Sequence, residues 1–88
     1  MNNAELETRL HEVFASPAPD AEKLALAFEA VTRRYLIEYA NEIELCIAMK
    51  DEENLLKERI KHGVLASARG MLNHCYYRLT GDFAWKED

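Results

Sequence analysis

The run Lys50-Asp51-Glu52-Glu53-Asn54 decides how this chain of 88 residues folds. All five residues are polar and none is Gly or Pro, so nothing in the run itself forbids one continuous helix. A helix from residue 20 to residue 80 would be a rod about 90 Å long, far from the lengths usual in a small domain. Asp51 is instead a good N-cap for a new helix. The run therefore predicts a tight turn.

On either side of this turn, the spacing of apolar residues predicts two long helices, over 20–49 and 52–80. In the first, the apolar residues that recur at steps of three or four are Leu24, Phe28, Val31, Tyr35, Tyr39, Ile43 and Ile47. In the second they are Leu56, Ile60, Val64, Ala68, Met71, Cys75 and Leu79. Asp20 suits an N-cap, and Gly81 suits the end of the second helix.

A shorter helix is predicted before them, over 3–15. Its apolar stripe is Leu6, Leu10, Val13 and Phe14. Asn2 and Glu5 have the spacing of a capping box, and two prolines after residue 15 end the helix. The expected fold is thus a single all-α domain over 1–88: a long antiparallel helical hairpin plus a short N-terminal helix, with a short acidic-aromatic tail over 81–88. It is either a three-helix bundle or half of a four-helix core formed by dimerisation.

A tight turn also predicts which residues of the two long helices face each other. Ile47 would meet Leu56, and Tyr39 would meet Val64 beside Gly63. Tyr35 would meet Ala68. Large rings would then lie opposite small residues, as interdigitated packing requires.

The formal charge of −5 is unevenly spread, because residues 1–55 carry −7 and residues 56–81 carry +4. In the predicted hairpin Glu44 lies opposite Arg59 and Glu42 opposite Lys61, so the two helices would neutralise one another. The negative total argues against nucleic acid as the main ligand. An alternative is an acidic nucleic-acid mimic or anti-host inhibitor of phage type. Its exposed acids would be Glu38, Glu42, Glu44, Asp51, Glu52 and Glu53.

Three features predict a cytoplasmic protein without a metal or cofactor. The chain has no apolar run long enough to span a membrane, and its first residues lack the pattern of a signal peptide. Cys46 and Cys75 suit a reduced compartment as small core residues. The histidines do not form a helical zinc pair, and Glu58 with His62 is typical of a surface interaction.

One motif raises an enzymatic alternative. The stretch Arg69-Gly-Met-Leu-Asn-His74-Cys-Tyr76 resembles the signature of HEPN-type ribonucleases, which are helical bundles usually acting as dimers. The resemblance implies that Arg69 stabilises phosphate charge and His74 serves as general base or polar stabiliser, with Tyr76 alongside. The structural interpretation places Arg69 on the solvent side, His74 beside the helix interface and Tyr76 over the open end of the hairpin.

A second resemblance is to the small co-chaperones of type III secretion needle subunits, which are short helical hairpins. It is carried by the amphipathic segment Leu6-Glu7-Thr8-Arg9-Leu10 and by the Ala-rich stretch 66–79 with its tyrosines. This chain has a longer first hairpin arm. The resemblance implies a hairpin that binds a partner protein.

The surface near the turn also indicates protein binding. A first helix of about 18 Å can cover only the open end of hairpin arms about 45 Å long. The apolar residues that then point away from the hairpin interface are Ile37, Leu45, Ala48 and Met49. Phe83 and Trp85 in the tail fold back over the open end or join an interface. We therefore expect a non-catalytic helical protein-binding module, such as an adaptor, chaperone subunit or small inhibitor, that acts as a homodimer or with a partner protein.

Overall fold

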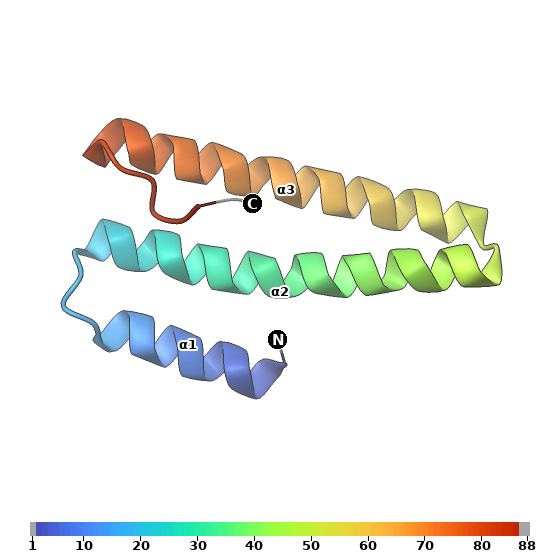
Figure 1. Cartoon of the computed structure of the whole chain (residues 1–88), viewed down its shortest axis with the longest axis horizontal. Coiled ribbons are helices and arrows are strands. Elements are labelled where there is room, and N and C mark those ends of the chain that lie inside the picture. Colours follow the sequence, from blue (N-terminus) through green and yellow to red (C-terminus); the bar gives the residue numbers. More distant parts are fainter. Residues whose placement is uncertain (1, 87–88) are drawn as a thin grey trace.

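The computed structural model describes residues 2–86 and contains three helices (Figure 1): α1, Asn3–Ala15; α2, Asp20–Met49; and α3, Glu52–Thr80. These bounds coincide with the predicted ranges, and the all-α class is confirmed, with no strand in the described part of the chain. Met1 and the last two positions of the expected tail lie outside the described residues.

The helix ends follow local chemistry. The Asn2 side chain accepts a hydrogen bond from the backbone N–H of Glu5 at 2.8 Å, as a capping box requires. Asp20 is the first residue of α2 rather than its cap, a position taken by Pro19. A carboxylate in the first turn still favours the helix because it faces the positive end of the helix dipole. Gly81 closes α3 with φ of 85° and donates its N–H to the Tyr77 carbonyl at 2.7 Å.

The chain reverses at Lys50 and Asp51, as the polar run predicts. Lys50 adopts φ of 55°, and its N–H bonds to the Ile47 carbonyl at 3.2 Å. The N–H of Asp51 reaches the Cys46 carbonyl at 2.9 Å, which completes a Schellman motif. The Asp51 side chain then accepts the backbone N–H of Asn54 at 3.2 Å and begins α3.

The three-helix arrangement is flat. Helix α2 lies in the middle, with α1 along one side and α3 along the other (Figure 1), and α1 and α3, both fully described, do not contact each other. The molecule measures 47 × 30 × 17 Å, so its shortest dimension is little more than one helix diameter. Its radius of gyration of 15.2 Å exceeds the roughly 12 Å expected for a compact domain of this length.

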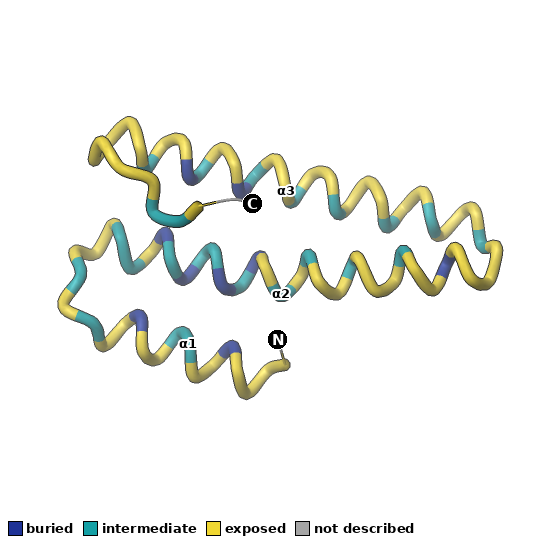
Figure 2. The backbone as a smooth tube through the Cα atoms, viewed as in Figure 1, coloured by how far each residue is buried: buried dark blue, intermediate teal, exposed yellow. Residues whose placement is uncertain are grey.

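The few buried residues gather at the open end of the hairpin, where α1 covers α2 (Figure 2). Eight of the nine belong to this half: Leu6, Val13, Ala25, Ala27, Ala30, Thr32, Arg69 and Asn73. The ninth is Cys46, near the turn. Among the described residues no large side chain is fully buried. The core is therefore thin and asymmetric.

The predicted inner face of α3 is wrong. Leu56, Ile60 and Val64 are 57–66% exposed, and Met71, Cys75 and Leu79 are exposed as well. Of the predicted face only Ala68, at its edge, is half-buried; the other buried or half-buried residues of α3 lie on the other side of the helix: Leu55, Glu58, His62, Leu65, Arg69, Leu72, Asn73 and Tyr76. Both stripes contain apolar residues at helical spacing, so periodicity alone does not determine which one packs on α2.

The predicted packing of Tyr39 against Val64 and Gly63 is also wrong, because Val64 is exposed and Gly63 stands in open space, while the pair of Tyr35 with Ala68 stays a prediction. Tyr35 is 41% exposed and stacks on Tyr39, with ring centroids 6.3 Å apart. The Lys61 ammonium lies 5.9 Å from the Tyr39 ring centroid, while a Cβ added to Gly63 would meet no atom within 4 Å. On α2, Phe28, Val31, Tyr39 and Ile43 are half-buried, whereas Leu24, Ala40 and Ile47 are exposed.

Candidate interaction surfaces

The outward side of α3 carries an exposed apolar stripe. We define the outer α3 stripe as Leu56, Ile60, Val64, Ser67 and Met71. Their spacing of three or four residues places them on one helical face, away from α2. The four large members are 57–67% exposed. A shallow groove along this face is lined by Gly63, Val64, Ser67, Ala68 and Met71. The outer α3 stripe thus forms a continuous apolar surface, which is narrow in the middle because the side chains there are small.

A second apolar surface lies on α2 near the turn. We define the turn-end patch as Ile37, Leu45, Ala48 and Met49. The exposed fraction is 40% for Ile37, 50% for Leu45 and 69% for Met49, because α1 covers only the other half of α2. These side chains are thus exposed, with Leu45 and Met49 at the edge of the hairpin beside Asn54 and Glu58, and their use in binding stays a prediction.

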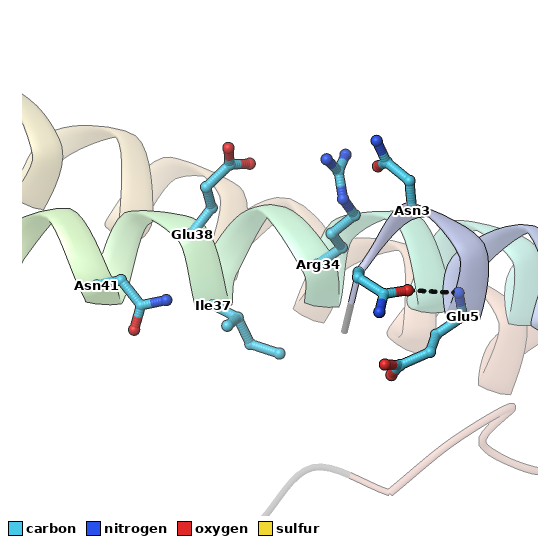
Figure 3. A pocket seen from close by; sticks show the side chains of 7 residues that line it. Asn3, Glu5, Arg34, Ile37, Glu38 and Asn41 are labelled. Carbon is cyan, nitrogen blue, oxygen red and sulfur yellow. Dashed lines mark hydrogen bonds between the residues drawn. The ribbon is translucent and has the colours of Figure 1, made fainter.

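The groove in Figure 3 marks where the cover by α1 stops. It is lined by residues from the start of α1 and from the middle of α2: Asn2, Asn3, Glu5, Arg34, Ile37, Glu38 and Asn41. Arg34 and Glu38 extend from one side of α2 in Figure 3, and Ile37 extends from another. Most of these side chains are polar. The groove adjoins the turn-end patch, with which it shares Ile37.

Arg69 is buried, against the prediction that it faces solvent. Its Nη1 donates to the Glu29 carbonyl and to the Thr32 hydroxyl, both at 2.7 Å, and its Nη2 lies 3.5 Å from Oε1 of Glu29. The Thr32 hydroxyl in turn donates to the Phe28 carbonyl at 2.6 Å. Charge-assisted bonds of this kind compensate the loss of hydration, which is why an arginine is tolerated between the helices.

The tail folds back along α3, as expected, but at a different place from Leu79, which is 74% exposed. Asn73 donates to the Trp85 carbonyl at 2.8 Å and accepts the N–H of Ala84 at 3.1 Å. Phe83 stacks on Tyr77 at 4.6 Å between ring centroids, and the Arg69 guanidinium lies 5.5 Å from the Trp85 ring centroid. Phe83 remains 54% exposed, and Trp85 is half-buried.

The structure separates the three residues of the ribonuclease-like pattern. Arg69 points toward α2, where it bonds to Glu29 and Thr32. His74 is exposed, not beside the interface, and its ring lies 6.4 Å from that of Tyr77. Tyr76 is half-buried on the inner face. In this monomer the arginine is engaged between two helices and the histidine is exposed to solvent, and the ribonuclease alternative stays a prediction.

The predicted charge pairing between the long helices is wrong. Neither Glu44 nor Arg59 forms an ion pair with a described residue. Lys61 pairs with Glu58 at 2.9 Å instead of with Glu42, and this hydrogen bond raises the pKa of the lysine. Among the acids named for the nucleic-acid mimic, Asp51 is half-buried. The others are exposed: Glu38, Glu42, Glu44, Glu52 and Glu53.

The two cysteine thiols differ in burial. Cys46 is buried, and this burial, with the Asp51 carboxylate nearby, raises the pKa of its thiol. Cys75 is exposed, so the prediction that it belongs to the core is wrong. The described residues contain no cluster of three or more His, Cys, Asp or Glu side chains that could hold a metal ion.

No described helix is both long enough and apolar enough to cross a membrane. Comparison of the chain with known protein families, with curated proteins and with solved structures finds no match. The candidate surfaces are therefore defined by the geometry alone.

Proposed function

We propose that this chain is a non-catalytic helical module that binds another protein chain through its exposed helical surfaces, as an adaptor, a chaperone subunit or a small inhibitor. The observation that supports the proposal is the large amount of exposed apolar surface on the hairpin. About half of the large apolar residues of α2 and α3 are exposed, while the inner face of α3 contains Glu58, His62 and Arg69 beside its leucines. Contiguous exposed apolar surface is typical of protein interaction sites.

The turn-end patch is the part of this surface that suits a different protein as partner. Its apolar side chains lie on the same helix as three exposed acids, Glu38, Glu42 and Glu44. An apolar centre beside charged residues is the usual composition of a binding surface. A partner with a hydrophobic centre and basic residues around it would complement this patch.

Site-specific photo-crosslinking tests the proposal in cells that naturally produce the chain. A benzophenone amino acid at Leu45 or Met49 should give one discrete product that contains a second polypeptide. The same probe at Glu12, which is exposed on α1, is the matched control and should give none. Placing a serine at Leu45 while the probe is at Met49 should reduce the yield, because apolar contact holds the partner.

The same benzophenone probe at Ile60 and at Val64 extends the test to the outer α3 stripe. Products at either surface support protein binding, and mass spectrometry identifies the second chain. Absence of any product from all four positions, with the chain folded as judged by circular dichroism, would contradict the proposal.

A further inference from the structure

We propose that the outer α3 stripe binds the same stripe of a second copy of this chain, with the two α3 helices antiparallel. This inference rests on the proposed function and names one partner for one of its surfaces. The stripe is exposed along α3, on the helical face away from the residues that are buried or half-buried beside α2. Its occupant is thus a chain outside this monomer.

An antiparallel pair centred between Val64 and Ser67 fits the stripe to itself. Val64 then meets Ser67 of the second copy, and Ile60 meets Met71 of the second copy. Gly63 meets Ala68 of the second copy. Small residues at the centre let two helices approach closely, and the larger side chains on either side fill the remaining space. Two-fold symmetry repeats each contact.

The charges at the ends of the stripe specify the antiparallel direction. Glu53 and Arg78 are exposed and stand equally far from the centre, so each meets the other across the pair. Arg78 forms no ion pair with a described residue, and Glu53 pairs only with exposed Lys57, at 3.6 Å. A parallel pair would place Glu53 against Glu53 of the second copy, which is repulsive.

Gly63 gives a second reason for a close neighbour. A glycine inside a helix costs stability relative to alanine, because its backbone loses more freedom on folding. A Cβ at Gly63 would meet nothing within 4 Å, so packing inside the monomer does not require the glycine. Close approach of another backbone would use this space, whereas Gly70 stands in equally open space outside the stripe.

The surface area agrees with the size of a stable interface. The chain exposes 6360 Å². A compact monomer of this mass, 10.2 kDa, is expected to expose about 5,300 Å². The excess of roughly 1,000 Å² belongs to the whole monomer, the turn-end patch included, and is of the same order as the roughly 800 Å² that each partner buries in a standard interface.

The turn-end patch is a poorer site for a second copy. Glu38, Glu42 and Glu44 lie on the same stretch of α2. Two-fold pairing of this stretch would bring acids against acids, and like charges at an interface disfavour association. The charge distribution therefore assigns self-association to the α3 face.

Charge reversal at the ends of the stripe tests the arrangement by light scattering. Wild type should have twice the chain mass of 10.2 kDa. Glu53→Arg and Arg78→Glu should each weaken the dimer by about tenfold or more, because each places like charges at both ends. The double variant restores opposite charges, so its dissociation constant should return to within about threefold of wild type. Circular dichroism confirms that these surface variants fold.

A pair of apolar variants separates this surface from the turn-end patch. Val64→Glu should give the monomer mass, and the matched control Leu45→Ser should leave the dimer intact. A wild-type monomer at about 100 µM would overturn the inference, since a micromolar complex forms at that concentration. So would a double charge reversal that fails to restore the dimer. Crosslinks from Leu45 or Met49 to a different protein would survive either result, so the proposed function can stand when this inference fails.

Discussion

The two halves of the hairpin use the same kind of helix in different ways. At the open end, α1 lies against α2 and the tail lies against α3. Almost all buried residues are found at this end (Figure 2). At the turn end, only two helices are present, and Cys46 is the one buried residue among those described. Yet residues 36–49 of α2 contain ten apolar side chains out of fourteen.

The two ends differ in the contacts that contribute to the free energy of folding. Burial of Leu6 and Val13, where α1 packs on α2, together with the hydrogen bonds of Arg69 and Asn73, stabilises the open end. The turn end is held mainly by its helix caps and by half-buried side chains such as Tyr39 and Ile43. Apolar residues at the turn end are thus available to another chain at little cost to the monomer.

The largest expected effect comes from removing the arginine that joins the helices at the open end. Arg69→Ala should lower the free energy of unfolding by about 2 kcal/mol, because the Glu29 carbonyl and the Thr32 hydroxyl lose their donor, and the Glu29 carboxylate keeps only its ion pair with Arg33, at 3.4 Å. Urea unfolding followed by circular dichroism measures the loss. Arg59→Ala is the matched control, since Arg59 is exposed and forms no ion pair with a described residue. Equal losses for both variants would show that the open end does not depend on this contact.

A smaller effect, of opposite sign, is expected at the turn. Lys50→Gly should raise the free energy of unfolding by about 1 kcal/mol, because glycine adopts a positive φ without the strain that a Cβ introduces. Lys57→Gly is the control: it places the same residue in the interior of α3, where it should lower stability by about 1 kcal/mol. Thermal unfolding of both variants checks the signs. A loss of stability in Lys50→Gly would contradict the Schellman geometry of the turn.

The smallest effect is a pH dependence of the turn end. Hydrogen bonds from the side chain and backbone of Asn54 lower the pKa of Asp51 from its ordinary value of 3.8. A lowered folded pKa means that the cap contributes its full stability above about pH 4 and loses it as the pH falls through the lower value. Asp51→Asn keeps the capping oxygen but does not titrate. The stability difference between wild type and this variant should be constant near neutrality and shift toward the variant in acid.

Thermal unfolding between pH 2 and pH 7, measured on both proteins, tests this sign, because the whole titration of a carboxyl group lies inside that range. A difference that does not change with pH would show that the Asp51 bonds to Asn54 add no stability. If the open end melts before the turn end in hydrogen exchange, the comparison between the two halves is itself wrong.

The sequence alone determined the helices, their ends and the reversal of the chain. These features depend on helix propensity, the two prolines, Gly81 and the Asp51 cap. Each acts through neighbours within a few residues, so its effect can be predicted from the amino-acid sequence alone. The exposure of Leu45 and Met49 also followed from the short reach of α1. These parts need no knowledge of what packs against what.

Only the tertiary structure decided which side of α3 meets α2. Leu55, Leu65 and Leu72 on one side compete with Leu56, Ile60 and Val64 on the other, and both sets have helical spacing. The two sets lie on different faces of α3, because successive residues of a helix are rotated by about 100° from one another. The choice rests on contacts between distant residues, such as the bonds of Arg69 to Glu29 and Thr32. Such contacts exist only once both helices are in place.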